Sequence, residues 1–223
     1  MIMTPRRGIW SVSPSIPADL PEVSQVSIVD DAVITDQQVV RADGSGARAR
    51  LVDLETLRWH GSSLSGAQID KLSLTDCAFT ECDLAVLAAP ESSWNRVLLA
   101  NCRMSGFSAA GATVQYVEVT DAVADLASWR FARLTRVRFT GGRWTQADFV
   151  GTTFDDVVFT DCDLTRADFS QAVVKKARFD NCRFDGVGGM DSLRRSVISY
   201  DDPTDALGLL GPMAHGLGIT LED

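Results

Sequence analysis

Histidine is scarce in this sequence, with two residues among 223, and no apolar run is long enough to cross a bilayer. A membrane-spanning helix needs about 20 consecutive apolar residues, so no membrane partner is expected. The opening stretch, MIMTPRRGIW, carries two arginines, but no apolar run of signal-peptide length follows it. We therefore expect a cytoplasmic protein.

The motifs of common enzyme classes are also missing. The sequence has no glycine-rich phosphate loop, no HExxH and no nucleophile elbow. Neither His60 nor His215 stands in a recognisable arrangement with a serine, a cysteine or a carboxylate. We expect no catalytic residue, no cofactor and no bound metal, and therefore no enzymatic activity.

Cysteine is present in an odd number, and a chain of this length does not need disulfide staples, so reduced thiols are expected. The spacing of the cysteines matches no familiar zinc-ligand pattern. The five residues are Cys77, Cys82, Cys102, Cys162 and Cys182.

Basic residues are outnumbered, with 21 Lys and Arg against 30 Asp and Glu, a net charge of −9. A protein that binds nucleic acid directly needs lysine and arginine to neutralise phosphates. This balance argues against such binding, although it is compatible with imitation of a nucleic acid. The apolar share of 45% suits a soluble globular unit.

The sequence does have a five-residue period. Every fifth residue from Leu54 to Phe184 is apolar, 27 positions without an insertion. A second series lies two places earlier, from Val52 to Cys182, and consists mostly of small residues, including all five cysteines. Neither the helical period of 3.6 residues nor the strand period of 2 produces this pattern.

A five-residue unit with one large and one small inward side chain leaves three residues to face water or turn a corner. Four such units close a square coil, and neighbouring coils stack about 4.8 Å apart. The pattern therefore predicts about 6.75 coils and a rod on the order of 32 Å long. The cysteines are explained as small packing residues of the coil interior.

The run CDLTRADFSQAVVKKARFDNCRFDG, residues 162–186, resembles the pentapeptide-repeat family, whose unit reads Ala-(Asp/Asn)-Leu-X-X. The resemblance implies an all-β fold, a right-handed quadrilateral parallel β-helix of about 6–7 coils. It also implies that a type II topoisomerase such as gyrase is a candidate partner. The best-studied relatives imitate DNA and occupy the DNA-binding saddle of the topoisomerase, which protects against quinolones or toxins.

Four segments are predicted. Residues 1–23 form an extended or disordered N-terminal segment, residues 24–51 an N-terminal β cap and loop, and residues 52–186 the β-helix. Residues 187–223 form a degenerate last coil and a C-terminal cap with a short helix, for which Asp202 is a good N-cap and Pro203 a good first residue. The cap is either a lid on a monomer or also a homodimer interface.

Three alanines test the register, because they stand where a large side chain is expected. Ala89 and Ala109 follow Leu87 and Phe107, so volume is exchanged between the two inward series. Ala124 has no such partner. We therefore expect a local irregularity there, with Val123 or Leu126 turned inward.

Function is expected to lie on the outer surface. Residues 52–186 hold 18 acidic against 14 basic residues, a net of only −4. The most acidic side carries Glu81, Glu118, Asp121, Asp161 and Asp180. A belt of arginines crowds one coil, formed by Arg130, Arg133, Arg136, Arg138 and Arg143.

The arginine belt is explained either as part of a partner surface or as solvated side chains paired with Asp148, Asp155 and Asp156. A small apolar surface region is also expected on the middle coils, either as a partner patch or as a result of irregular packing. Its residues are Ala85, Val86, Ala88, Ala110, Leu126 and Phe131.

Two functions follow from the sequence. The first is a non-enzymatic interaction solenoid with an unknown protein partner. The second is a DNA-mimicking modulator of a type II topoisomerase.

Overall fold

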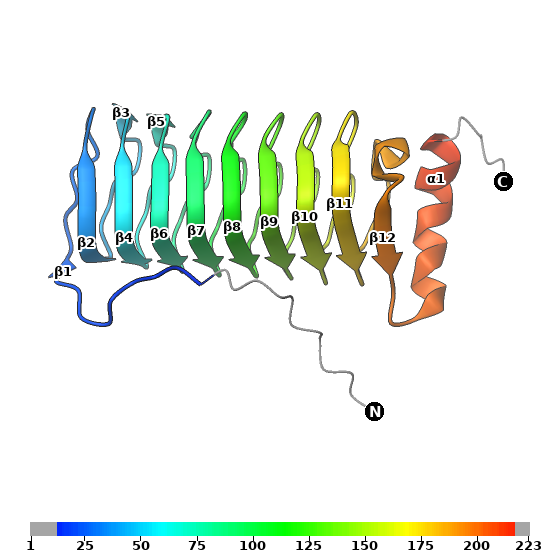
Figure 1. The fold of residues 1–223 in the computed structure, drawn as a ribbon, viewed down its shortest axis with the longest axis horizontal. Helices are drawn as coiled ribbons and strands as arrows, with labels where there is room; N and C mark the ends of the chain where they lie inside the picture. Colours follow the sequence, from blue (N-terminus) through cyan, green and yellow to red (C-terminus); the bar gives the residue numbers. More distant parts are fainter. Residues whose placement is uncertain (1–12, 217–223) are drawn as a thin grey trace.

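The computed structural model describes residues 13–216, and these form a rod of stacked coils (Figure 1). A ten-stranded parallel sheet runs along the rod in the order β1-β2-β4-β6-β7-β8-β9-β10-β11-β12. Residues 1–12 of the predicted N-terminal segment, and residues 217–223 of the predicted C-terminal cap, lie outside the described residues.

Long strands alternate with short bridges around each coil. The eight-residue strands are β2 Val33–Val40, β4 Asp53–His60, β6 Ser73–Thr80, β7 Ser93–Ala100, β8 Thr113–Thr120, β9 Arg133–Thr140, β10 Thr153–Thr160 and β11 Val173–Asp180. The shorter strands are β1 Glu22–Val23, β3 Arg48–Arg50, β5 Gln68–Asp70 and β12 Ser196–Ser199. The C-terminal end has two 3-10 helices, η1 Met190–Leu193 and η2 Pro203–Leu209, and one α-helix, α1 Leu210–Gly216.

Each coil has four sides of five residues, as the period predicts. In the β7 coil the first to fourth sides are centred on Trp94, Leu99, Met104 and Ala109, all buried. Neighbouring coils are in register with an offset of 20 residues, so that Leu99 pairs with Val119. All 27 large-series positions are buried, and the predicted β-helix is confirmed.

The predicted number of coils is wrong, because the sheet contains nine stacked turns, from the β2 coil to the partial β12 coil. The five-residue apolar pattern does not reveal the β2 coil, because small residues, Gly44 and Ala49, occupy the central positions of its third and fourth sides. Other side chains fill this space. A Cβ atom on Gly44 would lie 2.8 Å from Leu64 Cδ2 and 3.6 Å from Ile28 Cγ1.

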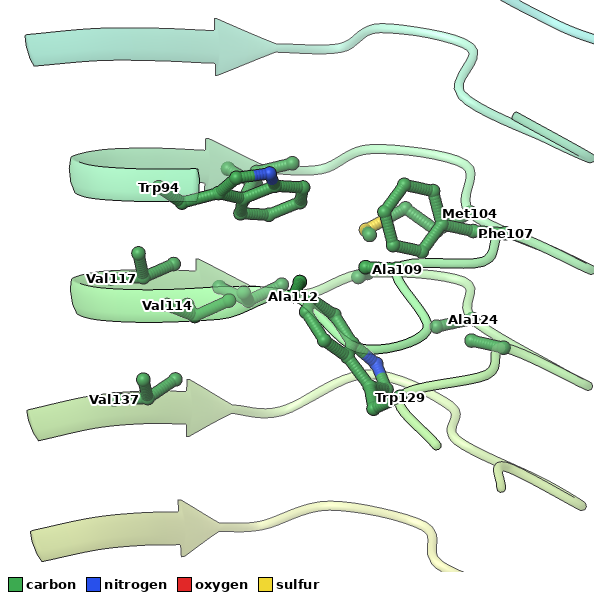
Figure 2. Close-up of a cluster of buried hydrophobic side chains, with 14 of the residues drawn as sticks. Trp94, Met104, Phe107, Ala109, Ala112, Val114, Val117, Ala124, Trp129 and Val137 are labelled. Atoms are coloured by element: carbon green, nitrogen blue, oxygen red, sulfur yellow. The ribbon is translucent and has the colours of Figure 1, made fainter. Parts of the chain in front are cut away.

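The irregularity predicted around Ala124 is also wrong. Val123 and Leu126 point outward, with 39% and 61% of their surface exposed. Figure 2 shows the indole of Trp129 beside Ala109, Ala112 and Ala124. The Trp129 ring centroid lies 5.5 Å from that of Phe107 and 5.6 Å from that of Trp94. Because the large ring on the following side of the same coil fills this space, no outer residue has to turn inward.

Residues 13–23, here called the N-terminal strap, run back along the outside of the first coils (Figure 1). The Arg58 guanidinium donates hydrogen bonds to the carbonyls of Ile16, Pro17 and Ala18, the shortest being 2.7 Å to Pro17. The Ser15 amide donates to Asp76 Oδ1 at 2.8 Å. The strap is therefore held to the β4 and β6 coils through its backbone.

The carboxylate that holds the strap is itself held by Arg96. Arg96 donates through Nε to Asp76 Oδ1 at 2.7 Å and through Nη2 to the other carboxylate oxygen. These hydrogen bonds lower the pKa of Asp76, outweighing the opposite effect of its burial. A carboxyl whose pKa is lowered by folding stabilises the fold above its unfolded pKa, and the stabilisation disappears as pH falls through its folded pKa.

We expect Asp76→Ala to release the strap, because it removes the acceptor for the Ser15 amide. Hydrogen exchange of peptides covering residues 13–21 should become about tenfold faster, since a hydrogen bond to a charged group contributes roughly 1.5 kcal/mol or more. Acidification of the native protein through the Asp76 pKa should have the same effect. The control is Asp83→Ala, which removes an exposed pair with Arg103. Equal exchange in both variants would contradict this anchoring.

The C-terminal end is closed by a half coil and the helices. β12 pairs with β11 with an offset of 19 residues, so that Phe179 lies opposite Ile198. Leu193 of η1 is buried, and Met190 and Leu209 pack against the core. Within residues 13–216 no helix has the length and apolarity that crossing a membrane requires.

Candidate functional site

The coil interior is filled with apolar side chains and buried thiols. All five cysteines are free and buried, as their place in the small inward series predicts. Burial raises the pKa of Cys77 to about 12. A thiol hydrogen bond with Cys82, together with burial, raises the pKa of Cys102, and Cys162 has the same arrangement with Cys182. Cys77, Cys102 and Cys162 are therefore poor nucleophiles, because the thiolate is the reactive form.

The raised pKa of Cys77 predicts a loss of stability in alkali. The unfolded thiol ionises above about pH 8.5, whereas the folded thiol does not, so stabilisation is lost as pH rises from there toward 12. Between pH 9 and 11, the free energy of unfolding of the native protein should fall by up to about 1.4 kcal/mol more per pH unit than that of Cys77→Ala. Urea unfolding at several pH values measures this difference. Parallel pH profiles for the two proteins would contradict it.

Other interior features offer little room for a ligand. A cavity of about 10 Å³ lies among Leu64, Leu84 and Phe107, room for at most about one water molecule. Within residues 13–216 no three histidine, cysteine or acidic side chains gather into a group that could hold a metal ion.

The acidic residues singled out in the sequence lie along one edge of the rod. Glu81, Asp121 and Asp161 occupy the corner between the second and third sides, at every second coil, and all three are exposed. Glu118 and Asp180 lie on the adjoining second side, in β8 and at the end of β11. We call Glu81, Asp121 and Asp161 the acidic row.

The five arginines encircle the rod, and several are paired. Arg130 pairs with Asp148 at 2.9 Å, as predicted. Arg143 donates to both carboxylate oxygens of Asp125. Arg136 donates to the Tyr116 hydroxyl, and its Cζ lies 5.2 Å from that ring centroid. Arg133 and Arg138 lie in β9.

Asp155 pairs with a lysine one coil further on instead of with the predicted arginines, and Asp156 also has a lysine partner there. Lys175 Nζ lies 3.0 Å from Asp155 Oδ2, and Lys176 Nζ lies 2.7 Å from Asp156 Oδ1. The offset of about 20 residues makes these side chains stacked neighbours, whereas β9 lies on the other side of β10.

Exposed apolar side chains stand at the two corners that flank the fourth side of the middle coils. Val86, Leu126 and Phe131 expose 63%, 61% and 59% of their surface, and we call these three the apolar patch. Ala88 and Ala110 lie between them and are half-buried. Ala85, which the sequence assigned to the same surface, is buried instead.

Glycines lie beside the patch, and they add no side chains to the surface there. A Cβ atom on Gly106 would lie 3.6 Å from Val86 Cγ2, and one on Gly151 would lie 2.5 Å from Phe131 Cδ1, so the Phe131 ring lies directly over Gly151. The Arg130 guanidinium carbon lies 5.3 Å from the Phe131 ring centroid. Apolar side chains at two corners of the coil therefore flank a nearly flat strip of small residues.

The family model of pentapeptide repeats matches residues 132–171 and 162–187, with eight copies of the repeat. This match confirms the resemblance expected from the sequence. No curated protein matches the chain.

Several solved structures are similar at low identity. A trypsin-treated form of QnrB1, a plasmid-mediated fluoroquinolone resistance protein, is 17% identical over 92% of this chain and 100% of its own, with a TM-score of 0.45. Full-length QnrB1 is 16% identical over 88% and 100%, with a TM-score of 0.36. HetL, a pentapeptide-repeat protein involved in heterocyst differentiation regulation from the cyanobacterium Nostoc sp. strain PCC 7120, is 14% identical over 75% and 85%, with a TM-score of 0.33.

Proposed function

We propose that this chain, which matches the model of pentapeptide repeats over residues 132–187, is a non-enzymatic interaction protein whose rod binds a protein partner through the apolar patch. The main support for this proposal is the exposure of Val86, Leu126 and Phe131 on one side of a rod whose other apolar side chains mostly point inward. Aromatic and apolar side chains surrounded by polar residues are typical centres of protein interfaces. The filled interior supports a binding role for the outer surface.

The partner is a protein, because the patch offers no concavity for a small molecule and no excess of positive charge for a nucleic acid. Arg130, which lies beside the patch, is paired with Asp148. A flat partner surface with its own apolar side chains fits best, since it buries the patch without leaving charges unpaired.

Site-specific crosslinking tests this function. A photo-crosslinking residue at position 131 or 126 should capture one partner in host cells, and one at Val158, in β10 on the opposite second side, should not. The partner, once identified and purified, should bind the native protein at least about tenfold more tightly than Phe131→Ser. Val173→Ser, which changes an exposed valine on β11, is the control. Equal binding by both variants would refute the assignment of the patch.

A second candidate function is modulation of a type II topoisomerase by imitation of DNA, and the acidic row favours it. Three exposed carboxylates along one edge, repeated about every 10 Å, provide negative charge along the rod axis. Against it, eight aspartates pair with arginine or lysine, from Asp76 to Asp185, so much of the acidic charge is neutralised.

A gyrase supercoiling assay decides this second function. The purified protein should inhibit supercoiling or protect against a quinolone at micromolar concentration, and the triple variant Glu81→Gln, Asp121→Asn, Asp161→Asn should do neither. No effect of the native protein would reject the mechanism.

The C-terminal cap is the proposed site of homodimerisation. Leu207, Leu210 and Met213 are exposed on η2 and α1, where a second copy could cover them. Sedimentation velocity should show a dimer that Leu210→Glu converts to a monomer. A monomeric native protein over the whole concentration range would leave the cap as a lid.

A further inference from the structure

The C-terminal cap carries exposed apolar side chains in a regular row. Leu207, Leu210 and Met213 expose between 48% and 65% of their surface, and we call these three the cap row. They follow one another at intervals of three residues through η2 and α1, so they lie along one side of the helical segment. The cap row is therefore a ridge about 10 Å long.

Another side of the same segment packs against the end of the rod. Leu209 packs against the core, and Ala214 is buried. A Cβ atom on Gly216 would lie 3.4 Å from the backbone nitrogen of Asp191 in η1. Figure 1 shows α1 beyond β12, at the end of the rod. Because the rod holds the helical segment in place, a partner of the cap row would not have to order it on binding.

The apolar patch has a gap of matching length. Val86, Gly106 and Leu126 occupy the same corner of three successive coils, and Gly106 N–H donates to Asp125 O of the next coil at 2.8 Å. Val86 and Leu126 therefore stand two coils apart, about 10 Å. Since Gly106 has no side chain, a ridge of three side chains can seat its middle member between them.

Charge does not oppose a contact between these two surfaces. Residues 206–214 of the cap include no charged side chain. Beside the patch, Arg130 pairs with Asp148, and Asp125 pairs with Arg143. Two apolar surfaces bordered by paired charges can cover each other without leaving a buried ion unpaired.

We propose that the apolar patch of one copy of this chain binds the cap row of a second copy. Leu210 of the second copy occupies the gap over Gly106. The Phe131 ring packs on the helix beside Gly211, where a Cβ atom would meet nothing within 4 Å. This inference rests on the proposed binding role of the patch, and it names the partner as another copy of the same chain.

The proposed contact joins two different surfaces of one chain. Each copy offers one patch and one cap row, so further copies can add head to tail. A dimer in which cap meets cap would instead use the same surface on both copies and would stop at two chains. Self-association should therefore depend on the patch as much as on the cap.

Complementation between two variants tests the proposal on the full-length protein. In sedimentation velocity at up to about 500 μM, the native protein should associate, and Leu126→Glu and Leu210→Glu should each remain monomeric. An equimolar mixture of the two variants should form a complex of two chains, because one supplies an intact cap row and the other an intact patch. Val173→Glu, which changes an exposed valine of β11 outside both surfaces, should associate like the native protein.

A photo-crosslinking residue at position 131 locates the contact in the purified protein. It should give an adduct of two chains, and the crosslinked peptide should contain residues 207–213. Leu210→Glu should lower the yield of this adduct at least about tenfold. All the replaced side chains are exposed, and circular dichroism checks that each variant keeps the fold.

Each outcome decides. A native protein that stays monomeric up to about 500 μM, or a mixture of the two variants that stays monomeric, would overturn the proposal. A dimer that Leu210→Glu dissociates and Leu126→Glu does not would also overturn it, because the caps would then pair with each other. Capture of a different host protein at position 131, without an adduct of two chains, would overturn the second copy as partner and keep the proposed function. No adduct of any kind would overturn both.

Discussion

Replacing Phe159 by alanine should lower the free energy of unfolding by about 3 to 5 kcal/mol. The Phe159 side chain is fully buried. Its ring stacks between Phe139, at a centroid distance of 4.6 Å, and Phe179, at 4.9 Å, with interplanar angles of 11° and 7°. The coils above and below are tied by backbone hydrogen bonds, so they cannot close the space that the ring leaves, and a cavity remains.

Urea unfolding followed by circular dichroism measures this loss. Two variants of the same coil are controls: Val158→Ala, which shortens a half-buried outward side chain, and Cys162→Ala, which removes one buried sulfur. Each should cost less than about 1.5 kcal/mol. A cost for Phe159→Ala no larger than that of Val158→Ala would contradict the stacked core. Unfolding or metal release by Cys162→Ala would contradict the packing role of the cysteines.

The second large effect is expected at Gly142, where even alanine should destabilise by about 3 kcal/mol or more. Gly142 has φ +81°, and a Cβ atom there would lie 2.4 Å from Ala122 O and 2.7 Å from Ala122 N. Both contacts are with the backbone of the preceding coil, which cannot move without breaking the hydrogen bonds between coils. Steric overlap therefore adds to the cost of a left-handed conformation.

Gly66→Ala separates these two costs. Gly66 has φ +67°, but a Cβ atom there would meet nothing within 4 Å. The free energy of unfolding of Gly66→Ala should fall by only about 1 kcal/mol, the cost of the left-handed conformation itself. Thermal unfolding of both variants measures the difference. Equal losses of unfolding free energy at the two glycines would mean that the coils separate easily at Gly142. That result would contradict a rigid spacing between neighbouring coils.

The regular coils were largely predictable, and the outer surface was not. The positions of Phe159 and Cys162 follow from the period, because each is one more member of an inward series. The ion pairs are different. Asp155 pairs with Lys175 rather than with the arginine belt, because stacked residues compete for one carboxylate and geometry decides between them. The acidic row was different again, because the predicted coil of 20 residues already placed its members on one side of the rod.

A five-residue period was enough to predict the inward series, the square coil and the filled interior, because these depend on neighbours within one coil and on the constant offset between coils. Tertiary structure alone decided the nine turns, the filling of the space beside Ala109 by Trp129 of the next coil, and the pairing partners. The reason is physical: these features arise where side chains of different coils share one volume, one carboxylate or one hydrogen-bond partner. Several arrangements satisfy the same local pattern, and only packing selects among them.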